Sequence, residues 1–152
     1  MCALMFTTAH GGAEGGARFP AVPAPVTQPA QETSLDGLGL TSQTVRGTAA
    51  SLAVAFPAPA TDLAASGSYL RVFFGHSAEA ADASTLRLLV NDVALVTVPL
   101  SVSTADGSVF VVAVPTNALH VDRPNLVEFL FAFVSAGSAS PDAFFGRIGA
   151  QT

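Results

Sequence analysis

The sequence predicts an all-β protein that folds as an antiparallel β-sandwich of about eight strands. From Leu35 onward, short runs of alternating apolar residues follow one another at fairly even spacing, and clusters of Gly, Pro, Asn, Asp and Ser separate them. The gaps are mostly too short for the crossover helices that parallel strands require. Among sandwiches, a jelly roll is favoured, and an immunoglobulin-like arrangement is the second choice.

The clearest strands flank Asn91 and Asp92 in the segment Ser84–Leu100, where apolar residues alternate on both sides. Asn and Asp tolerate left-handed backbone angles, so this segment predicts a β-hairpin with a tight turn. Between Leu126 and Val134, Val and Phe recur at every second position opposite a glutamate, which predicts a strand with one apolar face. The strands predicted, in chain order, are Leu38–Val45, Ser51–Phe56, Ser68–Phe74, Thr85–Val90, Val93–Leu100, Ser108–Val114, Leu126–Val134 and, with a weaker pattern, Phe144–Ile148.

The remaining segments are loops, two short helix candidates and a leader. Thr61–Ala65 and Pro115–His120 are the two places that could be helical. Residues 1–33 combine the run GGAEGGA with four prolines, which favours a disordered or extended leader with no core of its own. The sandwich domain is therefore expected to span residues 34–152.

Composition and charge exclude several function classes. The chain has 152 residues, 50% of them apolar and 11% charged, so it has enough apolar surface to fold as one domain. Six basic residues against eleven acidic ones give a net charge of -5, and no basic cluster occurs, so nucleic acid is not an expected partner. The sequence contains no apolar run of about 18 residues, so it predicts no membrane-spanning helix. The single cysteine, Cys2, cannot close a disulfide within the chain.

The sequence contains no recognisable set of catalytic or metal-binding residues. The three histidines have no ligand-type neighbours at zinc spacing, no GxSxG motif occurs, and most aspartates fall at turns, where their backbone preferences explain them. We therefore expect neither an enzyme nor a cofactor nor a metal. One aromatic irregularity stands out: Phe73 and Phe74 are adjacent in a predicted strand, so one of the two rings must point away from the core or into a second apolar layer.

The order of signals from Leu40 to Phe133 is similar to that of the first, N-terminal carbohydrate-binding domain of the periplasmic component of bacterial cellulose synthase. The resembling runs are TVRG, VAF, SYLRVFFGHSAEAADASTLRLLVNDVALVTVPL and VAVPTNALHVDRPNLVEFLFAF. Positions that correspond to the family pattern are Asn91, Pro99, Leu100, Asn117, Leu119, Asn125, Leu126 and Phe129.

The resemblance implies a non-enzymatic, jelly-roll glucan-binding and scaffolding module. Its partners would be a β-1,4-glucan and the cellulose synthase catalytic subunit or neighbouring domains of the same complex, in the periplasm beside the inner membrane. The family protein is several times longer and carries an export signal and a membrane anchor, so we expect this chain to be a truncated product or a single domain. Phe74, as an exposed ring near the end of the third strand, together with His76 and Asn91, is the expected glucan contact.

Two alternatives remain open. Low charge and a mean hydropathy of +0.52 also suit a structural protein that assembles into homo-oligomers through apolar outer strands. A lyase or hydrolase on a jelly roll is the other alternative, and it would need carboxylates or histidines that converge in one cleft.

Overall fold

The computed structural model describes residues 3–6, 32–59, 67–80, 82–135, 137 and 139–149. Its strands are β1 (Ala3–Phe6), β2 (Glu32–Ser34), β3 (Gln43–Arg46), β4 (Ala49–Phe56), β5 (Ser68–His76), β6 (Thr85–Val90), β7 (Val93–Pro99), β8 (Ser108–Val114), β9 (Asn125–Ala132) and β10 (Phe145–Ile148). The helical elements are the one-turn helix α2 (Val102–Ala105) and three 3-10 turns at Asp36–Leu38, Thr116–Ala118 and Pro141–Ala143.

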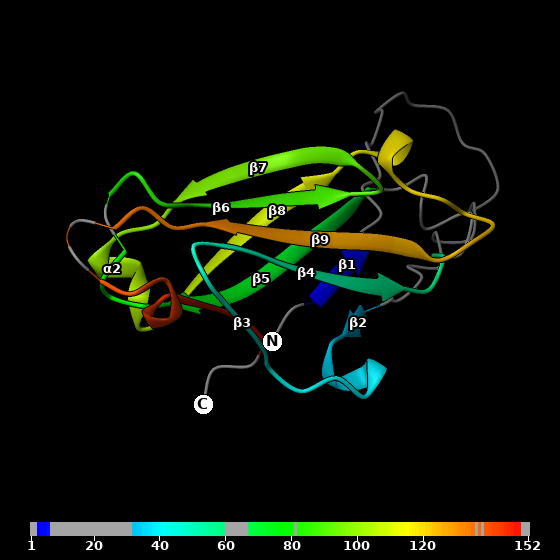
Figure 1. Ribbon diagram of the computed structural model, residues 1–152. Coiled ribbons are helices and arrows are strands. Elements are labelled where there is room, and N and C mark those ends of the chain that lie inside the picture. Colours follow the sequence, from blue (N-terminus) through cyan, green and yellow to red (C-terminus); the bar gives the residue numbers. More distant parts are fainter. Residues whose placement is uncertain are drawn as a thin grey trace, which may run out of the picture.

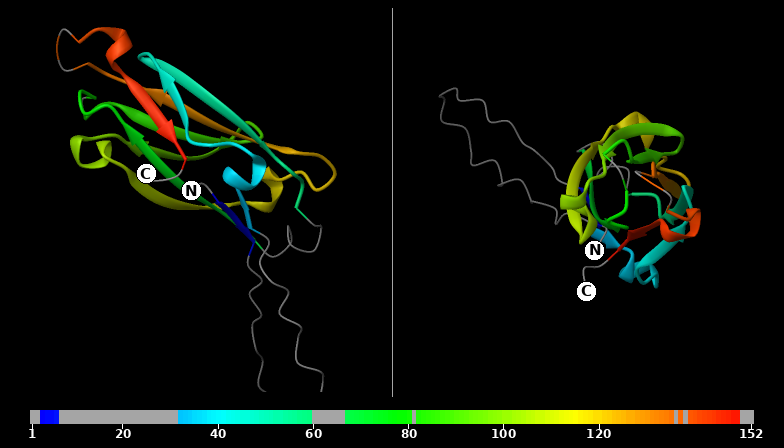
Figure 2. Two further views of the ribbon diagram at one scale, coloured as in Figure 1. Left: turned by 90° about the horizontal axis from the view of Figure 1, so that it is seen from below. Right: turned by 60° about the vertical axis from the view of Figure 1, so that its left-hand side comes forward.

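The strands form two antiparallel sheets that face each other (Figure 1). The first sheet has six strands: β5 at its centre pairs with β8 on one edge and with both β1 and β10 on the other, and β2 and β3 follow outside these. The second sheet has four strands in the order β4-β9-β6-β7. Seen nearly along the strands, the two sheets surround a common interior (Figure 2). The predicted antiparallel β-sandwich is confirmed.

The chain passes from one sheet to the other at nearly every connection from β3 to β10. The six-stranded sheet contains the path β8-β5-β10-β3 and the four-stranded sheet the path β4-β9-β6-β7, and only the hairpin of β6 and β7 stays within one sheet. Alternation of this kind is typical of a jelly roll, in which successive strands are shared between two facing sheets. An immunoglobulin-like sandwich has a different strand order.

The core lies between the sheets and is rich in phenylalanine. Its largest fully buried side chains include Phe56 of β4, Phe129 of β9 and Phe144 next to β10. Alternation places Val127, Phe129, Phe131 and Phe133 on the inner face of β9 and its C-terminal extension, as the sequence predicts. Full burial of one such side chain stabilises the fold by about 1.5–3 kcal/mol.

The hairpin predicted around Asn91 and Asp92 is confirmed. Both residues have positive φ angles, 48° and 67°, which is the geometry of a type I′ turn. β6 and β8 occupy the predicted ranges, and β7 and β9 differ from them by one or two residues at their ends. A register shift between Leu88 and Leu89 bends the β6–β7 pair.

The first predicted strand is largely wrong. Within Leu38–Val45 only the last residues join β3, because the preceding segment closes a 3-10 turn in which the amides of Leu38 and Leu40 both donate to the carbonyl oxygen of Leu35. Gly39 ends this turn with a φ of 74°, and the turn buries Leu35. Burial of leucines by a turn gives the same apolar pattern as a short strand.

Two strands fall in or across the segment expected to be a leader. Ala3–Phe6 pairs with Ser68–Arg71 of β5, and Glu32–Ser34 pairs with β1. The rest of residues 1–33 lies outside the described residues, as does the helix candidate Thr61–Ala65. The second candidate, Pro115–His120, contains a single 3-10 turn.

Candidate functional site

The side chains of β5 alternate strictly between the core and the outer face of the six-stranded sheet. Ser68, Leu70, Val72, Phe74 and His76 are buried and point inward. The outward positions hold Tyr69, which is 42% exposed, Arg71, which is exposed, and Phe73, which is half-buried. One strand thus contributes an aromatic, an arginine and a second aromatic to the outer face, about 7 Å apart along the strand.

The choice of Phe74 as the exposed ring is wrong. Phe74 is 4% exposed and packs edge-on against Phe110, with ring centroids 5.7 Å apart. Its neighbour Phe73 is the ring that points away from the core. The prediction that one of these two adjacent rings points away from the core is therefore confirmed. The outward ring is Phe73 and not Phe74, because Phe74 shares the inward phase of Leu70 and Val72.

His76 is also buried and belongs to β5, so the expectation of a loop histidine is wrong, while its contact with a glucan stays a prediction. β5 continues two residues beyond Phe74 because β10 pairs with that end of the strand. The Nδ1 atom of His76 donates to the carbonyl oxygen of Ser77 over 2.9 Å, and Nε2 lies 2.8 Å from the hydroxyl oxygen of Thr104 in α2. The ring stacks on Phe74 and lies 6.5 Å from the ring of Phe133. His76 ties α2 to the core.

Asn91 is half-buried, and the groups of its side-chain amide form hydrogen bonds within the protein. Its Nδ2 donates to the carbonyl oxygen of Ala118 over 2.7 Å and to Oδ1 of Asn125 over 2.8 Å, while its Oδ1 accepts from the amide of Leu126 over 2.9 Å. Asn125 in turn accepts from the amide of His120. These bonds join the tip of the hairpin to the start of β9. Contact of Asn91 with a glucan stays a prediction.

A row of aromatic and arginine side chains crosses the outer face of the six-stranded sheet. Arg71 lies over the ring of Phe73, with 5.1 Å between its guanidinium carbon and the ring centroid. Beyond Phe73 the row continues onto β10 and β3, whose outward residues pair with Gly75 and with one another. We call the whole row the aromatic–arginine stripe; it consists of Tyr69, Arg71, Phe73, Arg147, Phe145 and Arg46.

Gly75 makes room for the middle of the stripe. Arg147 pairs with Gly75 across the two strands. A Cβ atom on Gly75 would lie 3.4 Å from Nη2 of Arg147 and 3.3 Å from the carbonyl oxygen of Ala105. The guanidinium of Arg147 therefore lies close to the backbone of β5 at Gly75.

The stripe is long compared with a single small-molecule site. The amide of Ser77 donates to the carbonyl oxygen of Phe145, so Phe145 stands level with Ser77 at one end and Tyr69 marks the other. Eight residues of extended strand correspond to about 25 Å. Such a flat, elongated row suits an extended chain molecule better than a compact ligand.

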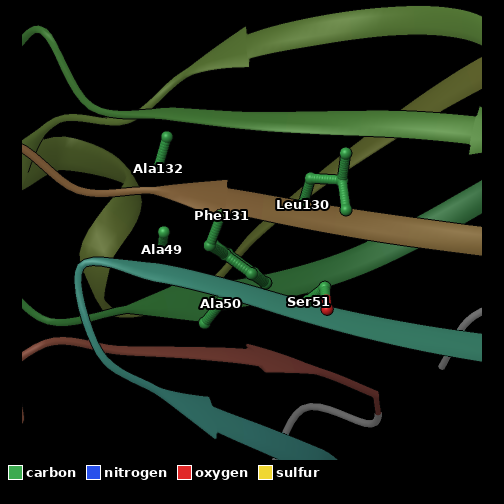
Figure 3. A pocket seen from close by; sticks show the side chains of 6 residues that line it. All are labelled: Ala49, Ala50, Ser51, Leu130, Phe131 and Ala132. Atoms are coloured by element: carbon green, nitrogen blue, oxygen red, sulfur yellow. The ribbon is translucent and has the colours of Figure 1, made fainter.

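The outer face of the four-stranded sheet differs in character. The outward positions of β4 and β9 hold Ala, Ser, Leu and Glu side chains, and no aromatic ring lies among these described positions. A shallow pocket of about 390 Å³ lies where the two strands meet. In Figure 3, Leu130 and Ala132 point to one side of β9 and Phe131 to the other. The lining residues are Ala49, Ala50, Ser51, Leu130, Phe131 and Ala132.

The phase of Arg71 is the sequence signal that identifies the outward ring. Arg71 is charged and stands two residues from both Tyr69 and Phe73, so all three must share the exposed face. The contribution of β10 carried no comparable signal, because pairing of residues so distant in the sequence is not visible in a local pattern.

In the part of the chain that the structure describes, no group of three or more His, Cys, Asp or Glu residues could hold a metal ion. None of the described helices is long and apolar enough to span a membrane.

Comparison with known families gives a match that covers most of the chain. The model of the family described as "Cellulose synthase BcsB, first CBM domain" matches residues 28–133, which is well over half of the chain. CBM denotes a carbohydrate-binding module. The sequence matches no curated protein. The matched range contains the hairpin at Asn91 and the Asn125 segment that carry the resemblance, and the chain therefore belongs to the family of the first CBM domain of cellulose synthase BcsB.

Proposed function

We propose that the chain binds a β-linked glucan through the aromatic–arginine stripe on the outer face of the six-stranded sheet. The observation that carries this proposal is the common outward phase of Tyr69 and Phe73 on β5, extended by Phe145 on β10. The flat CH faces of a sugar ring stack on aromatic rings, and neighbouring polar groups bond to its hydroxyls. A stripe of three rings with arginines between them offers both kinds of contact along one line.

The biological role that fits is binding and guidance rather than catalysis. Membership of the BcsB family supports a place in the cellulose synthase complex, on the periplasmic side, where the module would hold the emerging glucan beside the catalytic subunit. Contacts spread along a flat face are individually weak, so a polymer could advance past the module without a large barrier to release. This is the behaviour expected of a guide for a growing chain.

The chain offers a simple test, because it contains no tryptophan and Tyr69 is its only tyrosine. Its intrinsic tyrosine emission therefore reports on the stripe alone. During a titration with cellohexaose, the intensity of this emission should change and reach a plateau as the site saturates. In a native gel, hydroxyethyl cellulose should slow the migration of the protein. Replacing the stacked ring by Phe73→Leu should weaken binding about two- to tenfold, the range expected for one aromatic contact.

The matched control is Leu130→Ala, which removes an outward apolar side chain from the opposite sheet. It should leave the affinity unchanged. A flat titration of the unmodified chain, or an equal loss in Phe73→Leu and Leu130→Ala, would show that the stripe is not the glucan site.

One observation favours a second candidate, self-association. The edge strand β8 carries Val109, which is 47% exposed, and Val111, which is 63% exposed, on the same outer face. Light scattering over a range of concentrations should then show a mass that rises with concentration, and Val111→Lys should abolish that rise. A constant monomer mass would exclude this candidate.

A further inference from the structure

Half of the arginines in the chain gather on one face. Arg46, Arg71 and Arg147 belong to the stripe, whereas the whole chain has six basic residues and a net charge of -5. Among the described residues, none of these three arginines forms an ion pair with a carboxylate. An acidic protein thus presents a cationic row whose charges the described part of the fold does not neutralise.

The structure holds two of these guanidinium groups against flat surfaces. Arg71 lies over the ring of Phe73, with 5.1 Å between its guanidinium carbon and the ring centroid, and this contact restricts the movement of the guanidinium. Arg147 lies next to the bare backbone of Gly75. A guanidinium held in place in this way loses less freedom when it binds a carboxylate or a phosphate, with which it can form two parallel hydrogen bonds.

The register gives the spacing of the charges. Arg147 pairs with Gly75, four residues along β5 from Arg71, which corresponds to about 13 Å. Arg46 pairs with Phe145 and lies further along the same diagonal, on the next strand. The cations therefore alternate with the rings over the whole stripe, so a ligand that follows the rings meets a positive charge at repeated intervals.

We infer that the stripe prefers a glycan that carries acidic substituents, such as carboxylates, over a neutral glucan of the same backbone. This inference rests on the proposed function, since it assigns the ligand class of the same site. Complementary charge at exposed positions contributes about two- to fivefold in affinity per arginine. Nonspecific attraction cannot produce such a preference, because the net charge of the protein repels anions.

The experiment compares carboxymethyl cellulose with hydroxyethyl cellulose, two soluble polymers with the same β-1,4-glucan backbone. At low salt the unmodified chain should bind the carboxylated polymer about tenfold or more tightly, and added salt should reduce the difference. The triple variant R46Q/R71Q/R147Q should lose the preference, so that the two polymers bind to it with similar affinities. The control R87Q/R123Q changes the charge in the same direction at positions outside the stripe and should keep the preference.

The outcomes separate the two proposals. Binding of both polymers with equal affinity, or a preference that survives in the triple variant, overturns the inference and leaves the proposed function standing. Failure to bind either polymer overturns both. A further arm of the experiment uses vesicles that contain phosphatidylglycerol. If the protein floats with these vesicles only when its arginines are present, and shows no preference between the polymers, the cationic row binds a lipid surface and the inference is overturned.

Discussion

Replacement of Asn91 tests whether the hydrogen-bonded tip of the hairpin stabilises the fold. Its side chain takes part in three hydrogen bonds of 2.7, 2.8 and 2.9 Å that connect the β6–β7 turn to Ala118, Asn125 and Leu126. Each such bond contributes about 0.5–1.5 kcal/mol net. Glycine keeps the left-handed backbone, so Asn91→Gly should lower the free energy of unfolding by about 3 kcal/mol from lost hydrogen bonds alone.

Alanine at the same position adds a second cost. The φ of 48° is unfavourable for a residue with a Cβ atom, and Asn91→Ala should therefore lose about 1 kcal/mol more than Asn91→Gly. Asp92→Gly is the matched control, since Asp92 is exposed and has the same sign of φ in the same turn. This control should change stability by less than about 0.5 kcal/mol.

The assay is urea denaturation followed by far-UV circular dichroism, because the chain lacks tryptophan. If the free energy of unfolding falls with urea concentration at the same slope in all variants, their unfolded states are comparable. If Asn91→Gly unfolds within about 0.5 kcal/mol of the unmodified chain, the hydrogen bonds contribute nothing net and the structural interpretation of Asn91 is refuted.

Three further predictions concern residues in the core or next to it. Gly146→Ala would place a Cβ atom 2.6 Å from the ring of Phe131, so it should cost about 1–3 kcal/mol in urea unfolding, and Phe131→Leu in the same chain should restore part of this loss. Phe74→Ala should cost about 3–5 kcal/mol, whereas Phe73→Ala should cost about 1 kcal/mol and affect glucan binding instead; similar costs for both would contradict their opposite orientations. His76→Leu removes the hydrogen bonds of the imidazole to the Ser77 carbonyl oxygen, which keeps the Ala80 amide as a donor, and to the Thr104 hydroxyl, and it should cost about 1–3 kcal/mol. An unchanged urea midpoint would argue against a stabilising role of these two hydrogen bonds.

The parts of the fold that the sequence predicts well are those with local patterns. Alternation along β6, β8 and β9 depends only on which face of each strand is buried, and the Asn91–Asp92 turn depends only on two adjacent backbone angles. Family membership follows from the same segments. Asn91 and Asn125, which mark the family pattern, hold the hairpin and β9 together, so the pattern records a fold more directly than it records a ligand site.

The candidate site was predicted less well for two physical reasons. The strand was expected to end at Phe74, which made His76 a loop residue, whereas pairing with β10 extends β5 through His76 and keeps it in the inward phase. The exposed ring is identified by the phase of Arg71, which shares the outer face with Phe73, and not by the position of Phe74 near the end of the predicted strand. Arg147 and Phe145 could not be placed beside β5 from the sequence at all, because their register depends on long-range pairing.

Placement of β10 between β5 and β3 has a practical consequence for anyone who shortens this chain. The family match ends at Phe133, so a fragment cut there would lack the strand that fills the gap in the six-stranded sheet and bonds to both neighbours. Two lines of backbone donors and acceptors would be left open to solvent, and such edges readily recruit strands from other molecules. A soluble fragment for binding work should therefore extend through Gly149, whose amide donates to the carbonyl oxygen of Phe73.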